Sequence, residues 1–380
     1  MIDLDQQATT PLAREALEAM LPFLAENHAN PHSAHRAGRA ARAAIEAARV
    51  KVAGLLGADP ARLLFTSGAT EANNLALKGF FAGGRRGRLL TFATEHSCVL
   101  EAARALARAG TPVTILPVQA DGMPDFDSYE QALRAGDVAL VSAMRVNNEI
   151  GSVWPIARMA RLAAAHGARL HCDAAQGFGK VGCDLAADLG AAMVSVSAHK
   201  IHGPKGIGAL FVAGDVTLEP LLHGGGQELF RSGTQSPALA AGFGAAVRLA
   251  AGAMDADMAR AAMLQARALA ILREANVRFT VNGPAPGSPD RIATNLSLTF
   301  PGVASARLIP AVPRVLMASG AACSSGAGRP SHVLAALGLP REAVAATVRL
   351  GWSRQTTEDE IATAFSAIAK AVLAMQKLAA

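Results

Sequence analysis

The sequence predicts an α/β protein: a mainly parallel seven-stranded sheet with helices on both faces, plus a smaller α+β domain. Two patterns lead to this prediction. Between residues 62 and 212, short apolar runs alternate with segments of helical periodicity, which is typical of a parallel sheet covered on both faces. After residue 234, long alanine-rich helices come first, and short strands and helices then follow in mixed order.

Seven apolar runs are expected to form the main sheet, at residues 63–66, 88–92, 113–117, 138–144, 170–173, 193–197 and 207–212. Helices are expected between most of them, at residues 72–81, 98–109, 128–134, 156–166 and 185–189. The connection from residue 200 to residue 206 is too short for a helical crossover. The last strand should therefore run antiparallel to the strand before it.

The rest of the chain is expected to frame this sheet. An extended segment covers residues 2–11, and helices follow from about residue 13 and at 39–56. Further on we expect two long helices at 237–253 and 258–275, strands at 278–281, 292–300, 315–318 and 348–352, and a short helix at 331–337. Thr357 and Glu360 form a capping box that opens the last helix. We expect a large domain at 14–255, and a small domain made of 1–13 and 256–380.

Composition narrows the class of protein. The chain has 380 residues, 51% of them hydrophobic, which is enough for a large core. Its net charge is +6, but only 4% of residues are aromatic and the basic residues are scattered along helices, so nucleic acid is not an expected partner. The acidic N-terminus has no export signal, and no uncharged run reads as a bilayer span, so we expect a cytoplasmic protein without a membrane partner.

Cysteine and histidine spacing predicts neither disulfides nor a metal site. The four cysteines, at positions 98, 172, 183 and 323, form no disulfide framework and no paired ligand spacing, which suits a reducing compartment. His28, His32 and His35 lie in one polar stretch. No carboxylate or cysteine nearby completes a ligand set, so no metal is expected.

Lys200 and Asp173 each follow a predicted buried strand. In open α/β sheets that end of the strands is where ligands bind. A lysine there can act as a Schiff-base nucleophile, although a solvated loop lysine would show the same pattern. Pyridoxal phosphate needs such a lysine for its aldehyde, together with a carboxylate that keeps the pyridine nitrogen protonated. The pair therefore favours this cofactor.

Three further strand ends carry compatible groups. Residues 66–74 pass from a strand through Gly68 into a helix, whose free amides could bind a phosphate or could simply form a helix cap. His96 ends the second strand, where its imidazole could stack on a pyridine ring or could be an ordinary loop histidine. Asn148 follows the fourth strand.

These blocks resemble the NifS/IscS-like cysteine desulfurases, of the class V aminotransferase family, over nearly the whole chain. The matching segments share sequence and order, and they are Leu4-Asp5, 8–11, 30–35, 66–71, 94–96, 146–151, Asp173 with Gln176, 197–200, 223–226, 231–234, 319–323 and Arg349. The resemblance implies fold type I of the pyridoxal-phosphate enzymes and a homodimer with its active sites at the subunit interface. The activity implied is removal of sulfur from L-cysteine to give L-alanine.

The resemblance also implies roles for individual residues. Ala69, Thr70, Ser197 and His199 would hold the phosphate, with Thr234 reaching it from the partner subunit. Around the ring, Asp173 would pair with the nitrogen, Gln176 with the hydroxyl, His96 would stack on the face and Lys200 would bond to the aldehyde. Asn148 and Arg349 would take the substrate carboxylate, a role that suits the planar guanidinium group.

Cys323 would carry the sulfur as a persulfide for an acceptor, such as an iron–sulfur scaffold protein. It lies in residues 317–328, ten of which are glycine, alanine or serine. Such a segment buries little and can move. Cys172 and Cys183 are expected to be buried apolar residues, while Cys98, near a helix start, could be more reactive.

The chain departs from the family pattern in five places. Gln6-Gln7 stands where asparagine or serine is usual, Gln227 where histidine is common, and Gly351 where serine is frequent. Pro310 and Pro313 interrupt a segment that is helical in the family. The chain stops at Ala380, without the tail that housekeeping members use to dock their scaffold.

Three interpretations remain open at the level of sequence. The first is a cysteine desulfurase, and the second is selenocysteine lyase or another class V aminotransferase-like enzyme that uses pyridoxal phosphate. The third is a sulfur-carrier protein that keeps the fold without catalysis. Cys323 favours the first over an aminotransferase, and Lys200, Asp173 and His96 together argue against the third.

Overall fold

The computed structural model describes residues 1–320 and 330–379. Its main sheet has the seven predicted strands, which are β2 (Leu63–Thr66), β3 (Arg88–Phe92), β4 (Val113–Leu116), β5 (Val138–Met144), β6 (Arg169–Asp173), β7 (Met193–Ser197) and β8 (Gly208–Val212). Their order across the sheet is β2-β8-β7-β6-β5-β3-β4. The strands β4, β3, β5, β6 and β7 are parallel, and β8 is antiparallel to both of its neighbours, as the short connection before it predicts.

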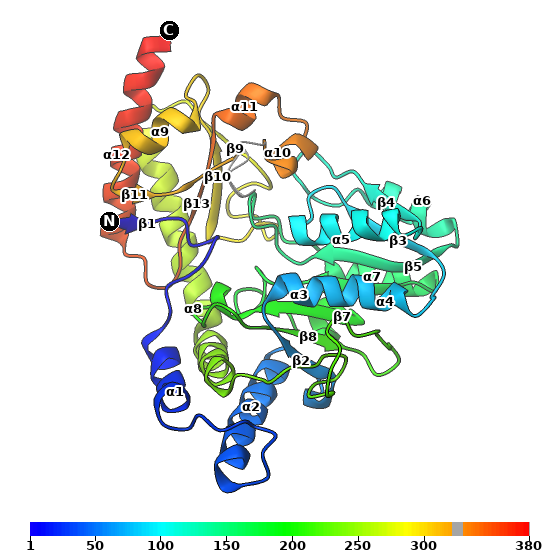
Figure 1. Ribbon diagram of the computed structural model, residues 1–380. Coiled ribbons are helices and arrows are strands. Elements are labelled where there is room, and N and C mark those ends of the chain that lie inside the picture. Colours follow the sequence, from blue (N-terminus) through cyan, green and yellow to red (C-terminus); the bar gives the residue numbers. More distant parts are fainter. Residues whose placement is uncertain (321–329, 380) are drawn as a thin grey trace.

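Helices cover both faces of this sheet (Figure 1). One face packs on α3 (Ala69–Asn74), α4 (Phe80–Ala82) and α5 (Ser97–Arg108), and the other packs on α2 (Arg36–Leu55), α6 (Phe126–Arg134), α7 (Ile156–Ala165) and the first half of α8 (Pro237–Glu274). Leu63 and Phe65 face the second group, whereas Leu64 between them faces the first. This alternation explains why the strands are apolar throughout.

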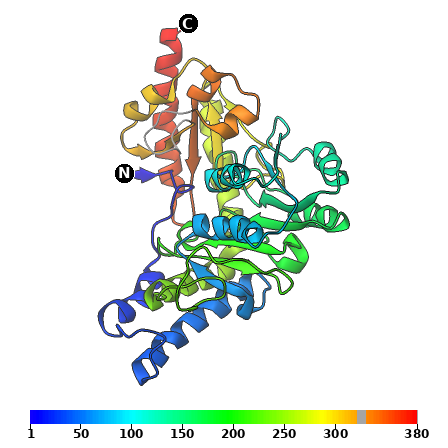
Figure 2. The same cartoon turned by 45° about the vertical axis from the view of Figure 1, so that its right-hand side comes forward.

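Helix α8 corrects one prediction. Two helices were expected at 237–253 and 258–275, but a single 38-residue helix runs through both ranges and passes from the main sheet to the second group of elements (Figure 2). Gly252 and two aspartates near the expected break do not end the helix, because the alanines around them favour helical backbone.

Among the described residues, α8 is the one helix whose length and apolar composition alone would allow it to cross a membrane. Half of its most apolar stretch is buried inside the molecule, and the helix contacts α1 (Arg14–Ala25), α2 and α12 (Glu358–Ala379). This packing is typical of a core helix of a globular fold.

A second group of elements surrounds the far half of α8. It contains β1 (Ile2–Asp3), β9 (Thr280–Val281), β10 (Asn295–Thr299), α9 (Ser305–Ala311), β11 (Val315–Leu316), β12 (Ala318–Ser319), α10 (His332–Ala336), α11 (Arg341–Ala345), β13 (Thr347–Gly351) and α12. Strands β12, β13, β10 and β9 form an antiparallel sheet, and β1 pairs with β11. The N-terminus therefore lies in this group, beside strands far along the chain.

The buried apolar side chains support the expected division of the chain. Most of those between residues 45 and 250 pack on the main sheet, whereas Leu4 packs with residues 261–372 in a separate cluster. We therefore propose a large domain at 14–255 and a small domain made of 1–13 and 256–380.

Local signals in the small domain also have their structural counterparts. Thr357 and Glu360 form the predicted capping box, since each backbone N–H donates to the other's side chain. Pro310 does not prevent a helix, because it lies in the last turn of α9, where the helix ends one residue later.

Candidate active site

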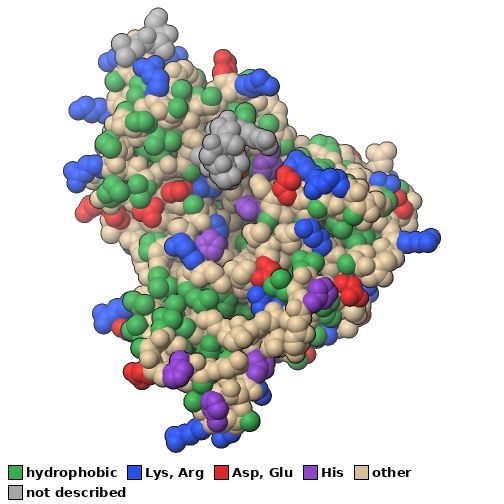
Figure 3. All heavy atoms as spheres, in the orientation of Figure 1, with side chains coloured by type: hydrophobic (Ala, Val, Ile, Leu, Met, Phe, Trp, Pro, Cys, Tyr) green, Lys and Arg blue, Asp and Glu red, His purple; other side chains and the backbone are tan. Residues whose placement is uncertain are grey.

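A cavity of about 650 Å³ lies at the carboxyl ends of β5, β6 and β7, beside the N-terminal segment and β13. Figure 3 shows this face of the molecule hollowed between the two domains, with histidine side chains around the hollow. The size suits a small ligand, and this end of a parallel sheet is where such ligands bind.

Most of the predicted site residues line this one cavity. They come from separate parts of the chain and are Ala69, Thr70, His96, Asn148, Asp173, Gln176, Ser197, His199, Lys200 and Arg349. The structure thus brings together residues that the sequence places at five strand ends. Their individual roles toward a cofactor stay predictions.

Lys200 reaches the cavity from a single 3₁₀ turn, Ala198–Lys200, that directly follows β7. Its Nζ donates hydrogen bonds to the backbone oxygens of Gln7, at 2.7 Å, and Ala8, at 2.9 Å. The N-terminal segment therefore meets the lysine inside the cavity.

Asp173 ends β6 and is 6% exposed. The Asn73 side chain donates to its Oδ2 at 2.7 Å, and the Ala175 backbone N–H donates to its Oδ1 at 3.0 Å. Two donors from different elements thus fix the carboxylate, which suits a group that must face a protonated ring nitrogen.

Glu95 lies beside Asp173 and is fully buried. Burial raises its pKa well above the usual range, and the charge of Asp173 raises it further. The Met144 backbone N–H donates to its Oε1 at 2.7 Å. Burial and Asp173 thus favour the protonated form of Glu95, while the Met144 N–H acts in the opposite direction.

His96 is the N-cap of α5, because its Nδ1 accepts a hydrogen bond from the Cys98 backbone N–H at 3.2 Å. A nitrogen that accepts carries no proton, so this network assigns the ring proton of the neutral form to Nε2. Burial lowers the pKa of His96, the negative charge of Asp173 acts against this, and the positive charge of Lys200 adds to the lowering. The neutral imidazole is therefore favoured at pH 7.

The expected phosphate cradle lies between β2 and α3. Gly68 takes a backbone φ of +152°, which L-residues rarely adopt, and the helical segment after it points its first amides at the cavity edge. Ser197 lines the same cavity, and its buried Oγ has no hydrogen-bond partner among the described residues. A buried hydroxyl in that state fits an anionic ligand that supplies the missing acceptor.

Gln176 and His199 complete this wall of the cavity. Gln176 donates to the Gln7 oxygen at 2.8 Å and accepts from the Lys180 ammonium at 3.2 Å. The Nδ1 of His199 lies 3.2 Å from the Thr9 hydroxyl. Burial lowers the pKa of His199 to about 4, and Lys200 lowers it further, so this imidazole is neutral as well.

Arg349 reaches the cavity from β13 in the small domain. Its Nη2 lies 2.8 Å from Asp5 Oδ1, and its Nη1 donates to the Asn148 backbone oxygen at 3.3 Å. The side chain is 6% exposed. The guanidinium and Asn148, which were predicted to share one substrate carboxylate, are thus in direct contact.

Two predicted residues lie elsewhere. Thr234 does not line the main cavity, and instead lines a neighbouring one of about 180 Å³ together with Ser67, Gly206 and Arg231. Cys323 lies outside the described residues. The placement of Thr234 agrees with a role toward another copy of the chain, which stays a prediction.

Burial disfavours the thiolate form of the other three cysteines. Burial raises the pKa of Cys98 to about 12 and that of Cys183 to about 12, and it raises the pKa of Cys172 well above its usual range. Cys98 does lie in the first turn of α5, as expected, but its higher reactivity is not supported. Among residues 1–320 and 330–379, no three histidine, cysteine or acidic side chains cluster as a metal site would require.

Several cavity residues were not predicted, above all Gln7, Ala8 and Thr9. The polar pair Gln6-Gln7 between apolar Leu4 and the Ala-Thr-Thr-Pro turn was a possible signal, because both glutamines are buried. Asn73 was also missed, although it stands in the segment predicted to hold a phosphate.

The fold and the donor set together define a class of enzyme. A lysine after β7, a carboxylate at the end of the adjacent strand β6, a histidine after β3 and an unpartnered hydroxyl in the same cavity fit the parts of pyridoxal phosphate. They are the features of a pyridoxal-phosphate enzyme of fold type I.

Comparison with known proteins defines the family. The model of the aminotransferase class-V family matches residues 2–363. A cysteine desulfurase IscS of Rickettsia akari is 40% identical, covering 99% of this chain and 92% of the relative, and a human cysteine desulfurase is 42% identical, covering 94% and 79%.

Solved structures agree with these relatives. A NifS-like protein superposes with a TM-score of 0.90 at 30% identity, covering 98% of this chain and 99% of that one. A structure of SspA in complex with cysteine gives a TM-score of 0.80 at 35% identity, covering 92% and 98%. The chain therefore belongs to the class-V aminotransferase family and, within it, to the NifS/IscS-like cysteine desulfurases.

Proposed function

We propose that the protein is a pyridoxal-phosphate-dependent cysteine desulfurase that converts L-cysteine to L-alanine and carries the released sulfur on Cys323. The observation that carries the proposal is the single cavity in which Lys200, Asp173, His96 and Arg349 converge. Membership of the cysteine desulfurase family supports it.

The chain's own groups match each part of the cofactor. Ala69, Thr70, Ser197 and His199 would hold the phosphate. Around the ring, Asp173 would pair with the nitrogen, Gln176 with the hydroxyl, and His96 would stack on the face. When bound, pyridoxal phosphate supplies an electron sink for the substrate's α-carbon, and Asp173 sustains it by keeping the ring nitrogen protonated.

Arg349 and Asn148 orient the substrate through its carboxylate. The relative solved in complex with cysteine supports cysteine as the amino acid bound here. Lys200 then takes the α-proton onto Nζ, within reach of the cavity's centre. His96 is placed to hold or pass on a proton through Nε2, the nitrogen that does not cap α5.

Sulfur transfer needs a separate nucleophile. The thiolate of Cys323 attacks the substrate sulfur, so that a new S–S bond forms while the substrate's C–S bond breaks. The electron pair of the broken bond stays with carbon, which gains a proton and leaves as alanine. The persulfide on Cys323 passes to an acceptor, such as a scaffold for iron–sulfur clusters, in the cytoplasm.

We also propose that two copies of the chain complete the site. Thr234 lies outside the cavity of its own chain, and helix α1 exposes the apolar stripe Leu17, Leu21 and Leu24 at helical spacing. A second copy would cover such a stripe and bring its Thr234 to the phosphate. Sedimentation equilibrium should give twice the mass of the chain, and a monomer that binds the cofactor fully would contradict the proposal.

The function is tested by product analysis. The protein loaded with pyridoxal phosphate and given L-cysteine plus a reducing thiol should release alanine and sulfide in equal amounts. A parallel assay with selenocysteine distinguishes a cysteine desulfurase from a selenocysteine lyase. The lyase would act on selenocysteine and leave cysteine unchanged. Amino-group transfer to a keto acid without sulfide would instead indicate an aminotransferase-like enzyme.

A further inference from the structure

The N-terminal segment Asp5–Thr10 runs through the candidate active site and touches its main cationic groups. Asp5 pairs with Arg349 at 2.8 Å, and the oxygens of Gln7 and Ala8 both accept from Lys200 Nζ. A protonated lysine has three N–H donors and no acceptor, so two adjacent carbonyl oxygens are good hydrogen-bond partners for it. We call the Gln7 and Ala8 carbonyls the seat of Lys200.

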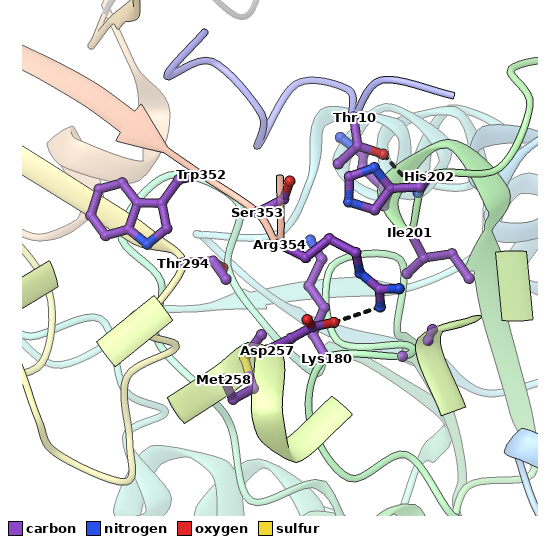
Figure 4. A pocket seen from close by; sticks show the side chains of 13 residues that line it. Thr10, Lys180, Ile201, His202, Asp257, Met258, Thr294, Trp352, Ser353 and Arg354 are labelled. Atoms are coloured by element: carbon purple, nitrogen blue, oxygen red, sulfur yellow. Dashed lines mark hydrogen bonds and ion pairs between the residues drawn. The ribbon is translucent and has the colours of Figure 1, made fainter. Parts of the chain in front are cut away.

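The far end of this segment is fixed to the loop that carries the lysine. The Thr10 hydroxyl donates to the His199 oxygen at 2.9 Å and accepts from the His202 backbone N–H at 2.7 Å. Figure 4 shows Thr10 and His202 facing each other across this contact. The carbonyls of Gln7 and Ala8 therefore lie between two anchored ends.

The Gln7 side chain lies against Gly351, in the middle of the segment. It is 2% exposed, and its Nε2 donates to the Thr294 oxygen at 2.8 Å. A Cβ added to Gly351 would lie 2.5 Å from Gln7 Cγ, much closer than real contacts allow. The glycine thus makes room for this glutamine, and any side chain there would push Gln7, with its carbonyl, away from its position.

These two hydrogen bonds have a role in the proton transfer to Lys200. With the cofactor and substrate bound, Lys200 would have to be present as a free amine in order to act as a base. It then accepts the substrate's α-proton and becomes an ammonium group. Stabilising the ammonium makes the amine a stronger proton acceptor.

We propose that the Gln7 and Ala8 carbonyls are the seat of Lys200 whenever it is not bonded to the cofactor, and that the lack of a side chain at Gly351 leaves the Gln7 carbonyl in this position. Gly351 is in this sense a positioning residue for the proton transfer. The inference rests on the proposed function for its place in the reaction, but the contacts of Lys200 with the two carbonyls can be tested without that reaction.

The test measures the pKa of Lys200 in the full-length, cofactor-free chain, from the pH dependence of the rate at which it bonds to added pyridoxal phosphate, followed by absorbance. Gly351→Ala displaces the carbonyls, so the pKa should fall by about one unit, since a charge-assisted hydrogen bond is worth about that much. The charged or titratable neighbours Lys180, His96 and His199 are the same in every variant.

The double variant Gln7→Ala/Gly351→Ala removes the colliding Cγ and leaves the added Cβ 3.1 Å from the Gln7 backbone nitrogen, so it should recover most of the fall in the pKa of Lys200. Gln7→Ala alone relieves no clash and leaves both ends of the segment anchored. The pKa of Lys200 in this variant should therefore stay close to that of the parent. An unchanged pKa in Gly351→Ala would overturn the proposal, as would a double variant that fails to recover. A parent chain that never bonds to pyridoxal phosphate would instead refute the proposed function.

Discussion

At the scale of single residues, the site depends on groups that hold the reactive side chains rather than on those side chains alone. Asp173 keeps its orientation through Asn73, His96 keeps its tautomer through the start of α5, and Arg349 lies against Asp5. Each of these partners comes from a different part of the chain. Such contacts have no fixed sequence spacing, so a reading of the sequence finds the reactive residue but not its support.

Asn73 offers a direct test at this scale. Asn73→Ala removes the side-chain donor to Asp173 Oδ2, and a hydrogen bond to a charged group is worth about 1.5 to 3 kcal/mol. Affinity for pyridoxal phosphate, measured by absorbance titration of the cofactor-free protein, should fall tenfold or more. Asn74→Ala is the control, since Asn74 donates only to the Thr70 backbone. Equal affinities in the two variants would remove Asn73 from the site.

At the scale of elements, the strands were the most predictable part. All seven strands of the main sheet lie within one residue of their predicted bounds, because each is a short apolar run between turn residues. The helices were less certain, and α8 was wrongly divided. The alanines around residues 253–258 favour a helix whereas Gly252 disfavours it, so the local sequence gives opposing signals, and the elements that pack along α8 also contribute.

Two glycines of α8 test how this packing acts. A Cβ at Gly252 would meet nothing within 4 Å, whereas a Cβ at Gly244 would lie 3.0 Å from the Ala48 backbone in α2. Gly252→Ala should raise the free energy of unfolding by about 0.5 to 1 kcal/mol, because alanine favours the helix. Gly244→Val should lower it by about 1 to 3 kcal/mol through overpacking. Urea denaturation measures both, and a stabilising Gly244→Val would show that α2 and α8 do not pack as described.

At the scale of the whole molecule, neutral buried histidines make the fold sensitive to acid. His171 is fully buried in the main sheet between the hydroxyls of Ser142 and Ser195, and burial lowers its pKa to about 4. Below pH 6.5 the unfolded chain takes up a proton that the folded chain does not. The contribution of His171 is therefore fully present above pH 6.5 and is lost as the pH falls toward 4.

Between pH 6.5 and pH 4, the free energy of unfolding should fall by about 3 kcal/mol if the pKa of His171 is shifted by the full amount. His171→Asn removes the titrating group, so unfolding free energies of the variant, measured by urea at several pH values from 4.5 to 7.5, should vary less with pH than those of the parent. His199 and His202, whose pKa values burial also lowers to about 4, stay in both proteins and give the residual slope. Identical slopes would mean that His171 is protonated in the folded state.

The cavity as a whole was predictable to the extent that its residues end strands. Lys200, Asp173, His96 and Asn148 follow apolar runs, and parallel strands bring such ends together. The N-terminal segment was not predictable in this way, because it reaches the cavity from the small domain, whose packing on the main sheet no periodicity reveals. Thr234 lies outside this cavity and is proposed to act from a second copy, and Cys323 lies outside the described residues.

The central claim is that Cys323 takes the sulfur from cysteine, and Cys323→Ser tests it most directly. An alcohol is not ionised near neutral pH and cannot hold a persulfide, whereas the cavity that binds the cofactor and the substrate carboxylate is unchanged. The variant should therefore still bind pyridoxal phosphate and cysteine, judged by absorbance, but should form almost no alanine and no persulfide detectable by mass spectrometry. Cys183→Ala, a change in the core away from the cavity, should keep both products. Alanine released from cysteine by Cys323→Ser at the parent rate would contradict the account.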